Sequence, residues 1–594
     1  MTDFAAPLRD MDFALRELAH LDEVLALPGF EEAGADVVAS VLEEAAKIAA
    51  NVIGPLNTVG DRQGSRLVDG VVQTPEGWHE AWQTLVDGTW NALPFDPEWG
   101  GMGLPHVVNT AVQEMWQAAN MAFALCPMLT QGAVDAIVEN GSDALKALFL
   151  PKLVSGEWTG TMNLTEPQAG SDLAAIRSRA ERDGDRYRIF GQKIFITYGD
   201  HTLTENIVHL VLARLPDAPA GLKGISLFAV PKVKVDADGN PTGPNDVRCV
   251  SLEHKLGIHG SPTAVMSFGD NGGAEGYLIG EENRGVEYMF VMMNHARLSV
   301  GIQGLAIAER SYQQAVSYAR ERVQGRPAGW TGGKTGIINH PDVRRMLMTM
   351  KCQIEAMRAL AYEGAAHIDI AHHTTDPDRR AAAHRRYELL TPIIKGWSTE
   401  VGQEITSLGV QVHGGMGYVE ETGAAQHLRD ARITTIYEGT TAIQANDLVF
   451  RKVLRDKGAG IGALIADIRA LDADLAARPG EDFAAIRRAL TEGTDTLAGT
   501  VACFLGNDNP ALPAAGAVPF LRLAGAVVGG YQMARAAVAA ARRLGEDGAD
   551  TGFLNAKIAT ARFYAETILP TAQSYAHAAT AGAAVTMALD ETQF

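Results

Sequence analysis

The residues with the clearest chemical potential lie in segment 432–444, RITTIYEGTTAIQ. Glu438 stands between Tyr437 and Gly439, after the apolar Ile433 and Ile436. A carboxylate in apolar surroundings has a raised pKa and is a better base near neutral pH. Gly439 lets another molecule approach the backbone closely. By composition alone a loop glutamate is a solvated carboxylate, but these neighbours favour a general base.

Two further segments have turn-forming residues that suit a phosphate-bearing ligand. Segment 163–172, NLTEPQAGSD, combines a Pro-Gly turn with the hydroxyls of Thr165 and Ser171, and its peptide N–H groups are suited to oxygen atoms. Segment 411–417, QVHGGMG, has three glycines that would fit around a pyrophosphate, although no strand precedes them. Read alone, the first is also compatible with a surface turn. The second is also compatible with a helix C-cap, in which His413 is structural.

Composition narrows the function classes. The chain has 594 residues and a formal net charge of -20, with 46% hydrophobic residues, which indicates a globular protein of three or four domains. So acidic a chain is a poor general binder of nucleic acid or anionic membranes. The four cysteines lie far apart, so neither a metal site nor a disulfide framework is expected. The acidic N-terminal segment and the lack of a long uncharged apolar window favour a cytoplasmic protein without a membrane span.

The elements that would position these segments follow an α, β, α, α order. Residues up to about 150 have helical periodicity, with Asp36 as a candidate N-cap. Segment 187–197 is expected to form two short strands around Gly191, followed by strands at 207–215 and 225–230. Long helical patterns return at 298–323, 343–362 and 384–409. The chain after about 455 is rich in alanine and helical, with a loop predicted at 506–519.

Together these segments resemble one family, the acyl-CoA dehydrogenases, over nearly the whole chain. Residues 95–103, FDPEWGGMG, are similar to the family's PExxGGxG segment, and NLTEPQAGSD is similar to its TEPGAGSD flavin loop. Residues 297–326 resemble its first long C-terminal-domain helix. QVHGGMG and IYEGT follow at the matching places. Five such segments in the family's order are specific, whereas each alone is a modest signal.

The resemblance implies an α+β, mostly α fold with FAD as cofactor. The implied domains are a helical N-terminal domain (1–158), a β domain (159–285), a C-terminal four-helix bundle (286–454) and an extra helical domain (455–594). Glu438 matches the family's catalytic base. The residues implied to contact FAD are Met162, Thr165, Gly170, Ser171, Phe195, Thr197, Arg322, Gln324, Gln411, Gly415, Thr440 and Gln444. The residues implied to contact the substrate are Ser171, Arg297, Tyr437 and Gly439, and no metal is implied.

Three positions depart from the family pattern. Met162 replaces an aromatic or polar residue, and Phe195 replaces a tryptophan, which keeps a ring face and removes the indole donor. ERVQGR lacks the phenylalanine of the usual RxQFG, which puts the cross-subunit contact of Gln324 in doubt. The extra domain resembles a long subgroup that includes 3-methylmercaptopropionyl-CoA dehydrogenases.

The expected activity is desaturation of an acyl-CoA thioester to a trans-2-enoyl-CoA in fatty acid metabolism, with 3-methylthiopropionyl-CoA as one candidate substrate. Electrons would pass to an electron-transferring flavoprotein, and the enzyme would be a homodimer or homotetramer. An acyl-CoA oxidase, which passes electrons to oxygen, is the alternative. A thioester desulfinase would lack the base that Glu438 supplies. A DNA-associated flavoprotein of the alkylation-response type needs a basic face, which this acidic chain does not favour.

Overall fold

Helices make up most of the N-terminal part of the computed structural model, which describes residues 4–594. They are α1 (Leu8–Phe13), α2 (Leu21–Leu25), α3 (Ala35–Ile48), α4 (Leu56–Gln63), α5 (Trp78–Asp87), α6 (His106–Ala119), α7 (Met121–Asn140) and α8 (Asp143–Ser155). A hairpin of β1 (Arg66–Val68) and β2 (Val71–Gln73) lies between α4 and α5. The prediction of Asp36 as an N-cap is wrong, since α3 already includes Asp36 in its first turn.

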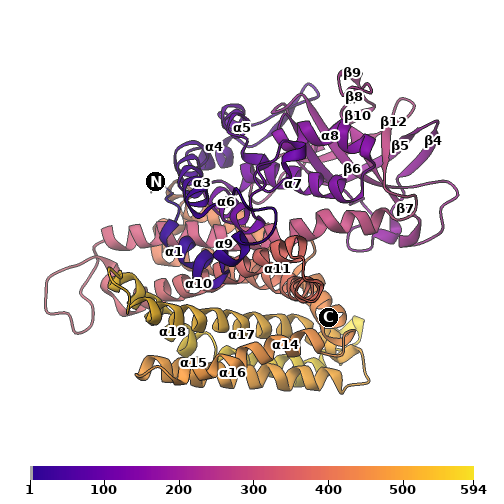
Figure 1. Ribbon diagram of the computed structural model, residues 1–594. Coiled ribbons are helices and arrows are strands. Elements are labelled where there is room, and N and C mark those ends of the chain that lie inside the picture. Colours follow the sequence, from indigo (N-terminus) through magenta and orange to yellow (C-terminus); the bar gives the residue numbers. More distant parts are fainter. Residues whose placement is uncertain (1–3) are drawn as a thin grey trace. The chain divides into compact units, whose positions relative to one another are not determined.

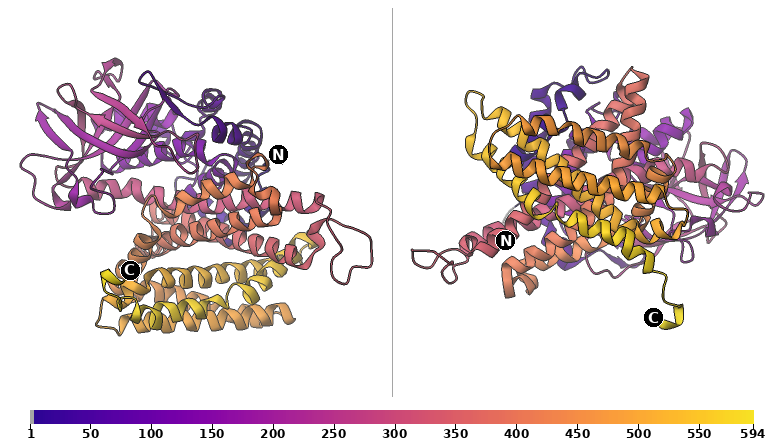
Figure 2. Two further views of the ribbon diagram at one scale, coloured as in Figure 1. Left: turned by 180° about the vertical axis from the view of Figure 1, so that it is seen from behind. Right: turned by 90° about the horizontal axis from the view of Figure 1, so that it is seen from below.

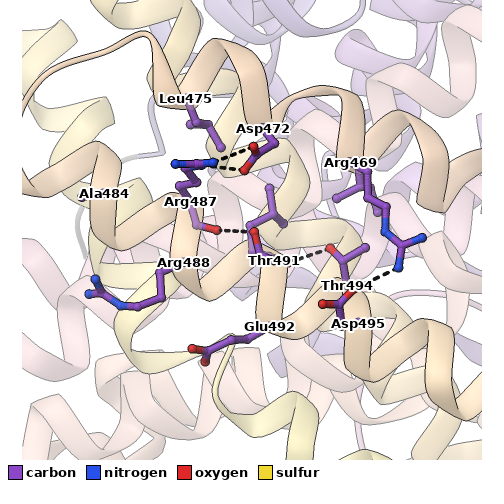
Figure 3. A pocket seen from close by; sticks show the side chains of 12 residues that line it. Arg469, Asp472, Leu475, Ala484, Arg487, Arg488, Thr491, Glu492, Thr494 and Asp495 are labelled. Atoms are coloured by element: carbon purple, nitrogen blue, oxygen red, sulfur yellow. Dashed lines mark hydrogen bonds and ion pairs between the residues drawn. The ribbon is translucent and has the colours of Figure 1, made fainter.

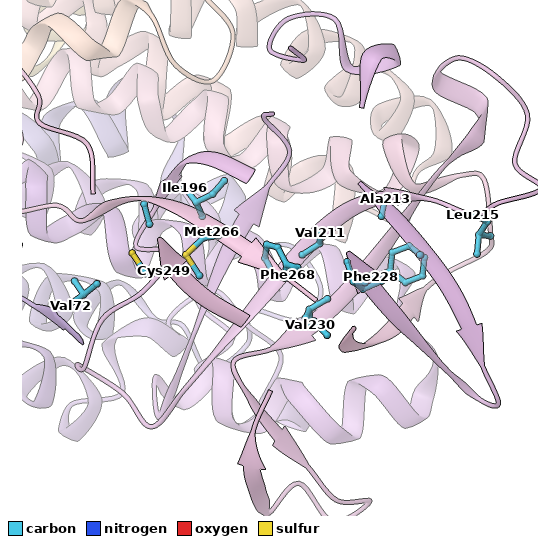
Figure 4. Packing of buried hydrophobic residues seen from close by; sticks show 14 residues of the cluster. Val72, Ile196, Val211, Ala213, Leu215, Phe228, Val230, Cys249, Met266 and Phe268 are labelled. Atoms are coloured by element: carbon cyan, nitrogen blue, oxygen red, sulfur yellow. The ribbon is translucent and has the colours of Figure 1, made fainter. Parts of the chain in front are cut away.

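The central segment forms an eight-stranded sheet. Its members are β3 (Trp158–Asn163), β4 (Arg179–Asp183), β5 (Arg186–Thr197), β6 (Asn206–Arg214), β7 (Ile225–Pro231), β10 (Val247–Leu252), β11 (Thr263–Phe268) and β12 (Ala274–Ile279). Seven strands follow the order β10-β11-β5-β12-β7-β6-β3, and β4 pairs with β5 and β6. Strands β8 (Val233–Val235) and β9 (Pro241–Pro244) form a separate pair. The buried residues Val211, Phe228, Val230 and Met266 belong to the core of the eight-stranded sheet (Figure 4).

Segment 187–197 corrects the prediction of two short strands, because it lies within the single strand β5. The two halves of β5 have different partners: Tyr187 to Ile189 pair with β12, and Gly191 to Thr197 pair with β11. Gly191 has φ 140°, and a Cβ atom there would lie 2.4 Å from Oγ of Ser178. The glycine therefore allows a close approach inside a continuous strand and does not end it.

The C-terminal half is helical throughout, which confirms the α, β, α, α order. Its helices are α9 (Gly285–Glu321), α10 (Pro341–His373), α11 (Pro377–His413), α12 (Ala424–Ala431), α13 (Thr441–Asn446), α14 (Ala459–Ala470), α15 (Asp472–Ala476), α16 (Glu481–Leu505), α17 (Ala511–Arg543), α18 (Thr551–Thr567) and α19 (Thr571–His577). Helices α16, α17 and α18 pack side by side, and α17 also packs against α10 and α11 (Figures 1 and 2).

The predicted loop at 506–519 is wrong beyond its first residues, because α17 begins at Ala511. Pro513 lies in the first turn, where the backbone N–H that proline lacks would have no helical partner anyway. Pro519 lies inside the helix. Pro513 is therefore compatible with the start of a helix, and α17 continues through Pro519, although the prolines of this segment had predicted a loop.

The chain divides into two compact units. One contains residues 4–43, Pro105–Glu114 and Val300–Phe594, and the other contains Glu44–Leu104 and Met115–Ser299. Helices α3, α6 and α9 each contain residues of both units. The unit with the C-terminal helices is called the helical unit below, and the unit with the large sheet is called the sheet unit.

A buried ionic cluster lies in the helical unit. Arg358 of α10 donates to Oε1 of Glu114 at 2.7 Å and to Oε2 of Glu309 at 2.8 Å. The hydroxyl of Tyr362 donates to the other oxygen of Glu114 at 2.6 Å. All four side chains are buried. Since an unpaired buried charge is costly, this cluster ties α6, α9 and α10 to one another.

Two helices among residues 4–594, α7 and α17, are long and apolar enough to cross a membrane by length and composition alone. In the most apolar window of α7, 89% of the residues are buried within the protein, and in that of α17 the share is 61%. Core helices of globular proteins have the same property. These two helices are therefore weak indicators of a membrane span.

Candidate active site

Glu438 lies in a turn between the short 3-10 helix Arg432–Thr435 and α13. Its backbone conformation is one that residues with a Cβ atom rarely adopt. Its φ is 54°, and the φ of the next residue, Gly439, is 85°. Two successive left-handed residues are unfavourable for any residue with a Cβ atom, so the surroundings must hold Glu438 in this conformation. The Glu438 side chain is half-buried. The turn therefore holds the backbone of Glu438 in a defined conformation.

Contacts from α13 hold one side of this turn. The Gln444 side-chain amide donates to the carbonyl oxygen of Glu438 at 3.2 Å. The Thr440 hydroxyl caps α13 by accepting from the backbone N–H of Ile443 at 3.3 Å. Oε1 of Gln444 is buried and has no hydrogen-bond partner within residues 4–594. A bound ligand would supply the donor that this acceptor lacks.

Contacts from α11 hold the other side of the turn. The residues of α11 that make them were not predicted from the sequence. Nζ of Lys395 donates to the carbonyl oxygen of Gly439 at 2.5 Å. The Thr441 hydroxyl donates to Oε1 of Glu400 at 2.6 Å. The signal that was available is a lone lysine in the apolar segment 389–397, LLTPIIKGW, where a charge has no reason to be without a partner.

Tyr437 connects the turn to α9. Its hydroxyl donates to Oε1 of Gln303. Burial raises the pKa of this hydroxyl well above its ordinary value, and the negative charge of Glu438 acts in the same direction. Tyr437 therefore stays neutral at physiological pH and gives Glu438 a neutral neighbour. Within the helical unit the structure thus brings together Tyr437, Glu438, Gly439, Thr440 and Gln444.

The predicted flavin loop, 163–172, belongs to the sheet unit and is organised around Glu166. This buried carboxylate accepts from Nζ of Lys193 at 2.8 Å, from the backbone N–H of Arg177 at 2.8 Å and from that of Ser178 at 3.0 Å. Residues Glu166 and Ala169 also exchange backbone hydrogen bonds of 3.0 Å each. The loop is therefore a rigid turn, which presents Gly170 and Ser171 to solvent.

The other predicted contacts in the sheet unit lie on neighbouring strands. The backbone N–H of Ile194 donates to the carbonyl of Thr165 at 2.9 Å, which joins β5 to the loop. Met162 and Thr197 are half-buried, on β3 and β5. Phe195 has φ 60° and its side chain is 59% exposed. An exposed ring on a left-handed residue is doubly unfavourable, and it fits a flat aromatic ligand that would cover it.

Four predicted residues of the helical unit lie on its surface. Arg322 and Gln324 are exposed beside the end of α9, and Gln411 and Gly415 are exposed at the end of α11. Their exposure is compatible with the contacts across a subunit interface that the family resemblance implies. Close by, His413 is buried, its ring stacks on that of Tyr318 at 4.5 Å, and burial lowers its pKa, as expected for a structural histidine.

Arg297, the remaining predicted substrate contact, is buried on α9 in the sheet unit. Its guanidinium lies over the ring of Phe290 at 5.6 Å and donates to Oδ1 of Asn294 at 3.3 Å.

No cluster of three or more His, Cys, Asp or Glu side chains suited to a metal ion occurs in the described part of the chain. The functional groups therefore belong to two sets, one in each unit.

A cavity of about 650 Å³ lies elsewhere, between α14, α15 and α16 (Figure 3). None of the predicted site residues lines it. Two ion pairs border it: Arg487 with Asp472 at 2.6 Å, and Arg469 with Asp495 at 2.9 Å. Because its cationic side chains are matched by acidic ones, the cavity has no charge preference that would identify a ligand.

Four family models match successive parts of the chain. They are "Acyl-CoA dehydrogenase, N-terminal domain" at 40–157, "Acyl-CoA dehydrogenase, middle domain" at 161–271, "Acyl-CoA dehydrogenase, C-terminal domain" at 283–452 and "Acetyl-CoA dehydrogenase C-terminal like" at 461–590. The last of these covers the helices that follow the segment 432–444.

Curated relatives match over almost the full length. The chain is 50% identical over 574 residues to the 3-methylmercaptopropionyl-CoA dehydrogenase of Ruegeria pomeroyi, covering 95% of this chain and 96% of that protein. It is 36% identical over 582 residues to a butyryl-CoA dehydrogenase of Syntrophomonas wolfei, covering 95% and 94%. The solved structure of Caenorhabditis elegans ACDH-11 in complex with C11-CoA has a TM-score of 0.74 at 22% identity and covers 96% of this chain and 93% of that one. At that identity the likeness concerns the fold.

Proposed function

The chain belongs to the acyl-CoA dehydrogenase family, and we propose that Glu438 is the base that removes the α-proton of its thioester substrate. The family's reaction is the FAD-dependent desaturation of an acyl-CoA between its α and β carbons, and this chain is an enzyme of that class. The observation that supports Glu438 is its carboxylate on a left-handed turn whose two carbonyls are held by Gln444 and Lys395.

Removing an α-proton needs a base in position and a donor for the developing enolate oxygen. Glu438 supplies the carboxylate, and we assign its own backbone N–H to the thioester oxygen by family resemblance. Tyr437, a phenol that is neutral at physiological pH, adds no second negative charge to the site. These residues bind, orient and deprotonate the substrate. FAD, when bound, supplies the acceptor for the β-hydrogen.

The residues present fit FAD. In the sheet unit the open backbone at Gly170, where an added Cβ atom would meet nothing within 4 Å, leaves space for a ligand next to the Ser171 hydroxyl. Phe195 offers an exposed ring face. In the helical unit, Oε1 of Gln444 is an acceptor without a partner in the described residues. We therefore propose that Gly170, Ser171 and Phe195, with Met162 and Thr165, hold the cofactor.

A short acyl chain is the proposed substrate. The relative in R. pomeroyi is named a 3-methylmercaptopropionyl-CoA dehydrogenase, and the relative in S. wolfei is named a butyryl-CoA dehydrogenase. Both acyl groups are short and linear. We propose 3-methylthiopropionyl-CoA as the preferred substrate of this chain. We also propose a cytoplasmic homodimer or homotetramer that passes electrons to an electron-transferring flavoprotein.

The test is anaerobic bleaching of the flavin absorbance by 3-methylthiopropionyl-CoA, butyryl-CoA and octanoyl-CoA. The wild type should be bleached fastest by the first. Glu438→Gln should keep FAD and lose bleaching by at least about 100-fold, the lower end of the range for a general base. Glu421→Gln, an exposed glutamate of the same unit, is the matched control and should behave as the wild type. Normal bleaching of Glu438→Gln would exclude Glu438 as the base. Stoichiometric peroxide release in air would identify an oxidase instead.

A further inference from the structure

Lys395 lies on α11 with its side chain fully buried. Its neighbours Leu389, Leu390, Ile393 and Ile394 are buried and apolar. An ammonium group in such surroundings is costly unless it is hydrogen-bonded, and an uncompensated one would lose its proton or destabilise the fold. The role of Lys395 therefore depends on the groups to which its ammonium donates.

One such group is the peptide carbonyl of Gly439, the residue after Glu438. Nζ of Lys395 donates to the carbonyl oxygen of Gly439 at 2.5 Å, while Gln444 donates to the carbonyl oxygen of Glu438 at 3.2 Å. Both left-handed residues of the turn are thus held through their carbonyls by side chains from other elements.

Helix α17 of the extra C-terminal domain packs against α11 at the two residues that follow Lys395. A Cβ atom at Gly396 would lie 2.5 Å from Cδ2 of Leu521 on α17. A Cβ atom at Gly525, also on α17, would lie 2.1 Å from Cγ of Trp397. Neither distance is possible for real atoms, so α17 approaches α11 closely only because both positions are glycine. The two residues that follow Lys395 are therefore in direct contact with α17, and Lys395 itself is fully buried.

We propose that Lys395 is a positioning residue that fixes the direction of the Glu438 carboxylate, and that α17 of the extra C-terminal domain keeps the Lys395 ammonium group in a dry environment. The inference rests on the proposed role of Glu438 as the base. A hydrogen bond to a charged donor is stronger where water is excluded, so the packing of α17 strengthens the Lys395–Gly439 contact. This assigns the extra domain a part in proton abstraction without any contact to substrate.

The experiment isolates proton abstraction from hydride transfer. The FAD-loaded enzyme is reduced with dithionite so that it cannot accept a hydride, and α-deuterated 3-methylthiopropionyl-CoA is then added in ordinary water. Loss of α-deuterium is followed by mass spectrometry. Lys395→Met should lower the exchange rate about 10-fold to 100-fold, as expected when a catalytic group moves by about 1 Å. Lys395→Gln, which restores a neutral donor, should recover part of the rate.

Two readouts distinguish positioning from a general loss of structure. FAD content and the dissociation constant for the thioester should stay at wild-type values in both Lys395 variants, so that the loss appears in the rate alone. Lys557→Met is the matched control, because Lys557 is a buried lysine of α18 that pairs with Asp10 and Glu355. It should lower the unfolding midpoint and leave the exchange rate of the folded enzyme unchanged.

Leu521→Ala tests the part of the proposal that concerns α17, because it removes the side chain against Gly396. The exchange rate should fall, by less than in Lys395→Met. Wild-type exchange in Lys395→Met, or an equal loss in Lys557→Met, would overturn the role of Lys395, and wild-type exchange in Leu521→Ala would overturn the role of α17. Undiminished exchange in Glu438→Gln would refute the base assignment itself, an outcome read from a different variant.

Discussion

Nζ of Lys193 lies 2.8 Å from Oε1 of Glu166, and both side chains are buried beneath the proposed flavin loop. Burial lowers the pKa of Lys193 to about 8, although the charge of Glu166 opposes this effect. The same lysine also donates to the carbonyl of Leu164 at 3.0 Å. One cation therefore holds the loop at two points.

We expect Lys193→Met to destabilise the sheet unit by about 3–5 kcal/mol, because it leaves the Glu166 carboxylate buried without its cation. Urea unfolding followed by fluorescence measures this loss. Lys223→Met, which removes an exposed lysine of the same unit, should change stability by no more than about 0.5 kcal/mol. A loss below about 1 kcal/mol in Lys193→Met would mean that the pair is not a major support of the loop.

The pH dependence of stability should contain a contribution from Glu166. Burial acts to raise its pKa, but Lys193, Ser178 and the backbone of Arg177 outweigh burial and lower the pKa to about 2. Since this folded-state pKa lies below the ordinary value of 4.5, the contribution is complete above about pH 4.5 and is lost as pH falls towards 2.

The measurement compares the free energy of unfolding of the wild type with that of Glu166→Gln at several pH values. The difference between the two proteins should shrink as pH falls from about 4.5 towards 2. A difference that grows within that range would have the wrong sign for a carboxyl group with a lowered pKa.

Arg358→Met should be among the most destabilising substitutions in the helical unit. It leaves Glu114 and Glu309 buried without their common cation, at a cost of about 3–5 kcal/mol. Arg345→Met, in the same helix, removes an exposed arginine that pairs with Asp342 and should cost less than about 1 kcal/mol. Thermal unfolding of both variants gives the comparison, and equal midpoints would contradict the assignment of a structural role to the cluster.

Gly439→Ala should lower turnover by about 10-fold or more. A Cβ atom at Gly439 would lie 2.6 Å from Nε2 of Gln444, so the substitution displaces the amide that holds the Glu438 carbonyl. Gly548→Ala is the control for backbone strain alone, because Gly548 has a similar φ of 77° and no atom within 4 Å of its added Cβ. Steady-state kinetics should show normal kcat in Gly548→Ala, and a normal kcat in Gly439→Ala would contradict the proposed contact.

Local patterns were sufficient to predict the order of elements and the chemistry of the main segments. The helices α10 and α11 and the strands β6 and β7 follow from periodicity and β-branched composition, which depend on residues close in sequence. The assignment of Glu438 as the base stays a prediction, which rests on its neighbours in IYEGT. Errors arose where proline or glycine is compatible with a regular element, as at Pro513 in α17 and Gly191 in β5.

The sequence by itself determined which residue types were available: a carboxylate after an apolar segment, a Pro-Gly turn with hydroxyls, and glycines beside exposed polar residues. Only the tertiary structure decided that Nζ of Lys395 donates to the carbonyl oxygen of Gly439, 44 residues later in the chain. The same is true of the contact between Leu521 of α17 and Gly396. The physical reason is that such contacts depend on how α11, α13 and α17 pack. Packing of that kind leaves no periodic signal in a single chain, since it joins residues far apart in sequence.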